Sequence, residues 1–421
     1  MKLIKKQQEL IYSLCVMALA FALVSDLFLK GLPEKIFYIV SYVAIIFTLH
    51  HAWTHRAEKI DNKPLIWLML SLVLFALSRI IWGFYFKDTF YKDIHWNYVN
   101  GGKRLLLTAF MVFYFYKSRS ALNKITLNLS LIILLAGLFY TLWLAIDAHF
   151  PNGRRIKLTA DAATTAAYII ILVCITSLYL AFQRFKSTSL SIVVFFVIFS
   201  INITLVIFTG TRAAVIVTPL LYISFFFFYY RNIHKFIIYG CLALFLAAAV
   251  GTPYAIWDRM KNIQDDISKY QVKNDTSVGA RFSIWKSGWD SVNFGIIGQS
   301  SDARTEKARD YIVKYERHNP EAWKNVAYHV HNDLLEVLSL QGVFGIFALL
   351  LFFICGVIFS LSRTMLRTNG VVFIIAPVFL LGLVDSVLIQ SNSVLLICIS
   401  LALMVTALKE KPGHSQSTTV S

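Results

Sequence analysis

The chain has 421 residues, of which 57% are hydrophobic and only 15% are charged, and its mean hydropathy is +0.64. This composition excludes a soluble globular protein and indicates a polytopic membrane protein, because each bilayer crossing needs about 20 mainly apolar residues. The net charge of +17 orients the protein in the membrane or binds an anionic substrate or lipid, and we expect no nucleic-acid partner.

Apolar segments of membrane-spanning length follow one another along the chain. Backbone polar groups in lipid must be satisfied internally, and the segments are too long for barrel strands. We therefore predict an all-α polytopic membrane protein with about twelve transmembrane helices, the first of them a retained span and not a cleaved signal peptide. The predicted spans are residues 11–29, 36–53, 64–86, 101–116, 127–149, 164–182, 189–210, 213–230, 236–257, 343–362, 371–390 and 392–408.

The distribution of basic residues predicts the orientation. An even number of spans places both termini on one side, and both termini are basic, which assigns this side to the cytoplasm. The long polar stretch between the ninth and tenth spans then faces outward. The expected organisation is a membrane domain over 1–257, a large outward loop with short helices over 258–330, a second membrane part with a preceding interfacial helix over 331–408, and a cytoplasmic tail over 409–421.

The long loop ends at His331-Asn332, where the chain re-enters an apolar segment. Asp333 followed by Glu336 is a capping pattern, which predicts that Asp333 caps a helix beside His331 at the water–membrane boundary. Histidine is the side chain best suited to accept a proton from a hydroxyl near neutral pH. His331 is therefore a candidate general base. The alternative is a solvated loop histidine, which is what we expect of His329.

Two arginines occupy outward positions at membrane level. Arg212 follows Gly210 in the tight turn between the seventh and eighth spans, and Arg281 begins a predicted helix with Trp285 on the same face. Guanidinium groups bind phosphate oxygens through paired hydrogen bonds. Together with His331 they would suit a diphosphate leaving group beside an acceptor hydroxyl. The alternatives are a headgroup contact for Arg212 and an ordinary surface position for Arg281.

Two ionisable residues, Arg79 and Asp385, lie inside predicted spans near their outward ends. Such residues are paired or functional, and Asp385 pairs either with an arginine of the site or with its polar neighbours. Outward segments such as 87–104, which holds Lys103 and Arg104, are basic against the topological preference. They contact either solvent and lipid phosphate or a phosphate-rich ligand.

Several sites are missing from the sequence. It has no phosphate-binding glycine loop and no Asp-x-Asp or Glu-x-Asp pair, and its five cysteines all lie in apolar segments, so we expect no cofactor, metal ion or disulfide. No predicted cytoplasmic loop is large enough to hold a soluble nucleotide sugar. This favours a donor that is carried by a membrane lipid.

These features together resemble the O-antigen ligase family, within the superfamily that also contains O-antigen polymerases, and the resemblance covers essentially the whole chain. Three motifs carry it: His331-Asn332 followed by Gly342-Val343-Phe344-Gly345, Gly279-Ala280-Arg281 with Trp285, and Arg212 with Ile216 where the family has leucine.

The resemblance implies an inner-membrane glycosyltransferase that moves O-antigen polysaccharide from undecaprenyl diphosphate to an outer-core sugar of lipid A–core. The reaction would be inverting, metal-independent and periplasmic. Arg212, Arg281 and His331 would be catalytic. Further substrate contacts are expected at Asn332, Trp285, Lys103, Arg104, Arg79 and Asp385. The nearest alternative is an O-antigen polymerase. A lipid or polysaccharide transporter is more distant, because no inverted repeat is evident, and a structural membrane protein would leave the motifs unexplained.

Overall fold

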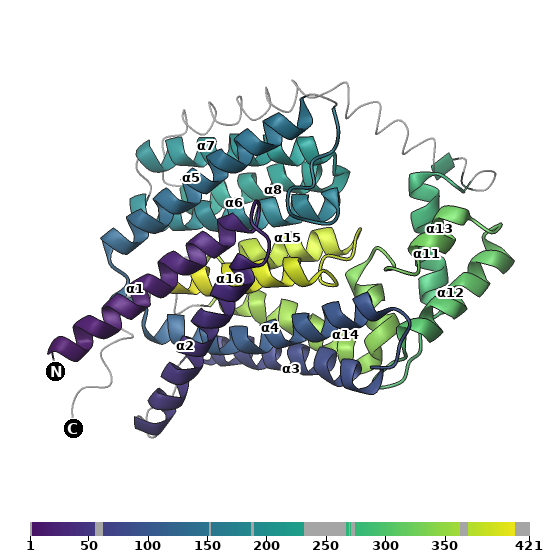
Figure 1. Cartoon of the computed structure of the whole chain (residues 1–421), viewed down its shortest axis with the longest axis horizontal. Helices are drawn as coiled ribbons and strands as arrows, with labels where there is room; N and C mark the ends of the chain where they lie inside the picture. Colours follow the sequence, from purple (N-terminus) through teal and green to yellow (C-terminus); the bar gives the residue numbers. More distant parts are fainter. Residues whose placement is uncertain are drawn as a thin grey trace.

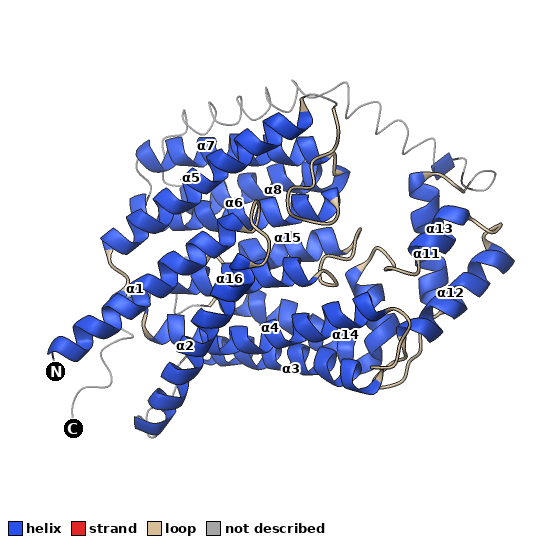
Figure 2. Ribbon diagram, viewed as in Figure 1, coloured by secondary structure: helices blue, strands red, loops and turns tan. Residues whose placement is uncertain are grey.

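The structure is a computed structural model, and it describes residues 2–54, 62–150, 153–186, 189–230, 267–268, 270, 274–362 and 369–408. The described part is helical and contains no strand (Figure 2). Eight of its helices are long and apolar enough to cross a membrane. These are α1 (Lys2–Ser25), α2 (Leu32–Thr54), α3 (Lys63–Tyr85), α5 (Lys124–His149), α6 (Ala163–Phe185), α7 (Ser189–Thr209), α8 (Arg212–Tyr230) and α14 (Asp333–Ser360).

The prediction of a polytopic all-α protein is confirmed, but the described residues contain eight candidate spans and not twelve. The predicted span 101–116 lies in α4 (Lys92–Lys117), whose N-terminal half is too polar to qualify. The predicted spans 371–390 and 392–408 are the shorter helices α15 (Val372–Gly382) and α16 (Ser391–Thr406). The predicted span 236–257 lies outside the described residues.

The helices form two groups with α15 and α16 between them (Figure 1). One group contains α3, α4 and α14, and the other contains α5 to α8. Among the eight candidate spans, α6 is the most enclosed, because its whole spanning window is buried inside the protein. Both α15 and α16 pack on α6. The connection between α15 and α16 therefore lies where the two groups meet.

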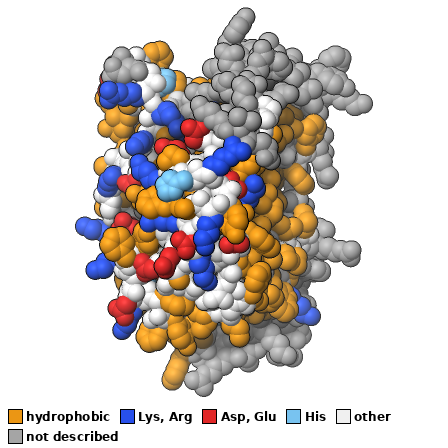
Figure 3. All heavy atoms as spheres, turned by 90° about the vertical axis from the view of Figure 1, so that its right-hand side faces the viewer, with side chains coloured by type: hydrophobic (Ala, Val, Ile, Leu, Met, Phe, Trp, Pro, Cys, Tyr) orange, Lys and Arg blue, Asp and Glu red, His pale blue; other side chains and the backbone are white. Residues whose placement is uncertain are grey.

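Three shorter helices of the long loop pack together at one end of the membrane helices (Figure 1). They are α11 (Ser277–Asp290), α12 (Ser301–Tyr315) and α13 (Pro320–Asn325), capped by Thr276, Ser300 and Asn319. A small apolar core holds them together: Ile284, Ala308, Ile312, Ala322, Val326 and Val330. Charged side chains gather on this end of the molecule (Figure 3), as expected of a surface that contacts water.

Glu316, at the end of α12, links the loop helices through its carboxylate. It accepts hydrogen bonds from Tyr270 at 2.5 Å and from Ser283 at 2.8 Å, and it pairs with Lys286 at 3.2 Å. Burial alone would raise the pKa of Glu316, but these hydrogen bonds outweigh it, so the pKa lies below its usual value. Because Ser283 and Lys286 belong to α11, the ionised carboxylate fixes α11 to α12.

Helix α14 is broken at Gly342, whose φ of +65° is a left-handed value that favours glycine. The segment 295–299 docks at the break. Its backbone exchanges hydrogen bonds with α14, from Gln299 N to Leu340 O at 3.0 Å and from Val343 N to Gly295 O at 3.2 Å. A side chain at Gly342 would meet the Gly295 carbonyl. Gly342 belongs to the motif that begins with His331-Asn332, which we call the histidine motif. This glycine therefore allows the 295–299 segment to dock on α14.

Candidate active site

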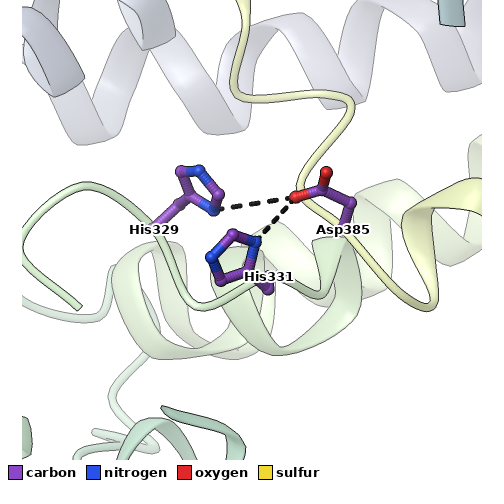
Figure 4. A group of neighbouring side chains, drawn as sticks. All are labelled: His329, His331 and Asp385. Carbon is purple, nitrogen blue, oxygen red and sulfur yellow. Dashed lines mark hydrogen bonds and ion pairs between the residues drawn. The ribbon is translucent and has the colours of Figure 1, made fainter. Parts of the chain in front are cut away.

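His331 and Asp385 form the centre of the site. Nδ1 of His331 lies 2.9 Å from Oδ1 of Asp385 (Figure 4). His331 has φ +52°, which is uncommon and costly for a residue other than glycine, and such conformations persist only where the surroundings impose them. One constraint is Trp285 of α11, whose Nε1 donates to the His331 carbonyl at 3.0 Å. The backbone therefore holds the imidazole in a fixed position.

The motif that begins at His331 binds the connection between α15 and α16, which we call the 383–390 segment. Three consecutive residues of the motif each make one of the contacts. They are His331 Nδ1 to Asp385 Oδ1 at 2.9 Å, Asn332 Nδ2 to Leu383 O at 2.9 Å, and Leu388 N to Asp333 Oδ1 at 3.0 Å. The histidine motif thus fixes its own carboxylate partner in place.

The surroundings of Asp385 favour its ionised form. Tyr168 of α6 donates to Oδ2 at 2.6 Å, the backbone N–H of Ser386 donates to Oδ1 at 2.9 Å, and the side chain is 7% exposed. An ionised carboxylate can only accept hydrogen bonds, so His331 must donate through Nδ1–H. Nε2 of His331 is then free to accept a proton. Tyr168 was not predicted from the sequence. Its hydroxyl in an apolar helix was the available sign, because a buried phenol usually has a hydrogen-bond partner.

The prediction that His329 is a solvated loop histidine is wrong. Its Nδ1 lies 3.9 Å from Oδ1 of Asp385, and its ring meets that of His331 edge to face with centroids 4.1 Å apart. Burial, and then the neighbouring His331, lower the pKa of His329 to about 3. His329 is therefore neutral near pH 7. The contacts arise between segments far apart in the chain, so spacing gave no sign of them.

The capping prediction is wrong by one residue. Asn332 is the N-cap of α14 and accepts from Leu335 N at 3.0 Å, whereas Asp333 is buried against the 383–390 segment. Glu336 does not complete a capping box. It accepts from Val330 N at 2.7 Å and pairs with Arg304 of α12 at 3.3 Å, with both side chains fully buried. This pair fixes α12 to α14 directly beneath the histidine motif.

Arg281 lies in the first half of α11, one turn before Trp285, and is half-buried. It lies on the helix whose Trp285 donates to the His331 carbonyl. Arg212 is exposed and begins α8. Its turn packs on the first residue of α6 through the Thr211 hydroxyl, which donates to Ala163 O at 3.3 Å. Arg212 therefore lies at the same end of α6 as the tyrosine that binds Asp385.

The structure places Arg79 and Arg104 inside the protein. Both side chains are fully buried. Arg79 donates to the Leu388 carbonyl at 2.5 Å, and Arg104 donates to the Ser391 carbonyl at 2.5 Å and pairs with Glu34 at 2.7 Å. A fully buried guanidinium has no surface for a substrate, so these two hold the 383–390 segment and the start of α16. Of the basic residues expected to contact substrate from this region, Lys103 is exposed.

His329, His331 and Asp385 together present one ligand atom each, and all three atoms lie within 4.8 Å of one another. Two imidazoles and a carboxylate are a donor set that suits transition metals. The sequence predicts no metal site because it has no pair of carboxylates close together in the chain, and these three residues meet only in the folded protein.

The fold and the site together define a polytopic membrane protein with a histidine–carboxylate pair between its long loop and its membrane helices. A sequence model of the O-antigen ligase family matches residues 195–350, a range that includes Arg212, Arg281 and His331. The chain is also 25% identical over 416 residues to the O-antigen ligase of Escherichia coli strain K12, covering 95% of this chain and 93% of that protein. The chain is therefore similar to the O-antigen ligase family over residues 195–350 and to an O-antigen ligase over nearly its whole length, in agreement with the resemblance carried by the three motifs.

Proposed function

We propose that this protein is an O-antigen ligase, a glycosyltransferase-type enzyme of lipopolysaccharide biosynthesis. It transfers O-antigen polysaccharide from undecaprenyl diphosphate to an outer-core sugar of lipid A–core, at the periplasmic face of the inner membrane. The observation that carries the proposal is the 2.9 Å contact between His331 Nδ1 and Asp385 Oδ1. This contact leaves Nε2 of His331 as a base at the end of the molecule that carries the loop helices.

His331 acts as the general base of a single displacement. Nε2 takes the proton of the acceptor hydroxyl while its oxygen attacks the anomeric carbon of the donor, and the bond from that carbon to the diphosphate oxygen breaks. The electron pair of that bond leaves with the diphosphate. Because the hydroxyl attacks from the face opposite the diphosphate, the configuration at the anomeric carbon is inverted. Asp385 holds the correct tautomer and stabilises the imidazolium that forms, as the carboxylate does in a catalytic triad. Such base assistance is typically worth roughly 10²–10⁴-fold in rate.

The arginines act on the leaving group. Arg281 is half-buried on α11, the helix whose Trp285 donates to the His331 carbonyl, and Arg212 is exposed at the same end of α6 as Tyr168. Both bind the diphosphate and stabilise the negative charge that grows as it leaves. Trp285 positions His331 through its carbonyl. Lys103 is the exposed candidate for contact with the phosphates of lipid A–core. Because the charge on the leaving group is met by guanidinium groups, the reaction requires no divalent metal.

The membrane topology belongs to the same proposal. Both termini face the cytoplasm, and the long loop with α11, α12 and α13 faces the periplasm. The parts 1–257, 258–330, 331–408 and 409–421 keep the roles predicted above. Glu306 is exposed on α12, so a cysteine introduced there should react with a membrane-impermeant maleimide added to intact spheroplasts. If the maleimide reacts with this cysteine only after the inner membrane is opened, the loop helices face the cytoplasm and the proposed topology is wrong.

The chemical test is reconstitution of purified protein with undecaprenyl-diphosphate-linked glycan and lipid A–core, followed by gel analysis of the product. His331→Ala should leave the glycan on its carrier. A matched control is His318→Ala, because His318 has a similar φ of +54° but lies exposed in the loop. If His331→Ala ligates at the wild-type rate, His331 is not the general base. Extension of the lipid-linked glycan in place of its transfer to lipid A–core would indicate a polymerase.

A further inference from the structure

The cluster of His329, His331 and Asp385 contains a nitrogen, Nδ1 of His329, that has no part in proton transfer by His331. Nδ1 of His329 is buried and makes no hydrogen bond within the described part of the chain. It faces the same oxygen of Asp385 that His331 contacts, at 3.9 Å against 2.9 Å for His331 (Figure 4). The cluster therefore contains one unused nitrogen pointing at a carboxylate that is already bound by a second imidazole.

The spacing of these three atoms suits one small metal ion. Zinc binds histidine nitrogen and carboxylate oxygen at about 2.0–2.2 Å in a tetrahedral arrangement, which separates neighbouring ligand atoms by roughly 3.3–3.6 Å. The observed separations from Asp385 Oδ1, 2.9 Å and 3.9 Å, lie on either side of that value. Small side-chain rotations would bring all three atoms to coordinating distance.

We propose that this cluster binds one imidazole-preferring transition-metal ion of the Zn²⁺, Co²⁺ or Ni²⁺ type, and that the bound ion inhibits transfer. Imidazole ligands suit these ions, whereas Mg²⁺ and Ca²⁺ prefer sites built from oxygen atoms alone. The binding half of the proposal depends only on the geometry. The inhibition half rests on the proposed role of His331 as base.

Inhibition follows from the two tautomers of His331. In the metal-free site the proton is on Nδ1, bonded to Asp385, and the lone pair of Nε2 is free. A metal ion at Nδ1 takes the lone pair there, and the displaced proton moves to Nε2. The imidazole remains neutral and no electron is transferred, but Nε2–H can no longer accept the proton of the acceptor hydroxyl. The ion also takes the carboxylate that would stabilise the imidazolium.

The binding test uses the full-length protein in detergent after removal of any polyhistidine tag. Co²⁺ is titrated in and followed by its visible absorption, and Zn²⁺ is followed by calorimetry and by its displacement of Co²⁺. We expect one ion per chain, with no displacement by Mg²⁺ or Ca²⁺. His329→Gln and Asp385→Asn should each weaken binding by at least the roughly 10–100-fold that losing an outer partner of a metal ligand costs. His318→Gln, in the exposed loop, should bind as the wild type does.

Wild-type binding that is absent, or that persists in both His329→Gln and Asp385→Asn, would overturn the site. Because this readout is spectroscopic and thermal, it holds even if a variant ligates poorly, and circular dichroism shows whether each variant is folded.

The activity test adds Zn²⁺ to the reconstituted reaction. We expect at least a tenfold loss of ligation that EDTA reverses, at a Zn²⁺ concentration that matches the binding curve and not that of zinc with the donor diphosphate alone. Unchanged or increased ligation in the metal-bound enzyme would overturn inhibition. If His331→Ala ligates normally while Zn²⁺ still binds, the proposed function fails and the site stands. If Zn²⁺ does not bind while His331→Ala is inactive, the site fails and the function stands.

Discussion

Replacement of Asp385 by asparagine separates the charge of the carboxylate from its hydrogen-bonding geometry. The backbone N–H of Ser386 donates to Oδ1, the same oxygen that His331 contacts. An asparagine should therefore keep its carbonyl oxygen at the Oδ1 position and place its amino group toward Tyr168, whose hydroxyl can turn to accept. His331 then keeps the tautomer with Nε2 free, and the variant loses only the negative charge.

The expected loss is modest. Hydrogen bonds to charged groups contribute about 1.5–3 kcal/mol and those to neutral groups about 0.5–1.5 kcal/mol. The difference of about 1–2 kcal/mol corresponds to a roughly 5–30-fold lower turnover for Asp385→Asn. Asp385→Ala also loses the orientation of the ring and should fall further, toward the roughly 10²–10⁴-fold that a general base supplies.

The assay is single-turnover ligation measured from pH 5 to pH 8. A base must be unprotonated, so the rate falls as the pH falls, and without the carboxylate the imidazolium is less stable. In Asp385→Asn the acid limb should therefore move to lower pH. Asp310→Asn, on the exposed side of α12, is the control. Wild-type turnover with an unmoved acid limb in Asp385→Asn would refute the assignment of Asp385 as the partner of the base.

Three further outcomes are expected. Arg281→Lys should weaken transition-state binding in ligation by about 1–3 kcal/mol, because lysine cannot donate bidentately. Arg154→Lys, in the exposed 153–155 stretch, should ligate as the wild type does. Equal activity of the two variants would show that Arg281 is only a surface charge. Glu316 has a lowered pKa, so its stabilisation is present above its unfolded value of about 4.3 and is lost as the pH falls through the folded pKa. The protection of α11 amides, taken relative to their intrinsic exchange rates at each pH, should fall at low pH in the wild type. In Glu316→Gln the protection should be low at every pH, and identical protection profiles would exclude the link. Gly342→Ala should lower the melting temperature by more than Gly153→Ala, since both have positive φ but only Gly342 faces nearby backbone; equal shifts would leave the docking of 295–299 unsupported.

The sequence predicted the helices well where hydropathy alone decides them. It failed for the span 371–390, which is apolar enough to read as one crossing but leaves the helix after Gly382. Non-helical backbone is tolerated at membrane depth only where the protein satisfies its polar groups. Here Asn332, Asp333 and Arg79 bind the freed carbonyl and amide groups. Hydropathy counts side chains and cannot register backbone bonds made by a distant motif.

The same reason explains which site residues could be predicted. His331, Arg281 and Arg212 could be proposed as site residues because each belongs to a local motif. Tyr168 and His329 were not, because their roles arise only when segments far apart in the chain meet at Asp385. The pairing of His331 with Asp385 joins residues 54 positions apart, and no local spacing predicts it.

The position of Asp385 has a consequence for how the enzyme is made. His331 leaves the ribosome before the 383–390 segment that carries its partner, and α16, which packs on α4 and α6, follows later still. A nascent chain that has inserted α14 therefore holds a histidine with no carboxylate, no fixed tautomer and no clamp on the motif. Under the proposed mechanism, competence for transfer depends on the 383–390 segment, so chains truncated before this segment should reach the membrane yet leave the lipid-linked polymer untouched.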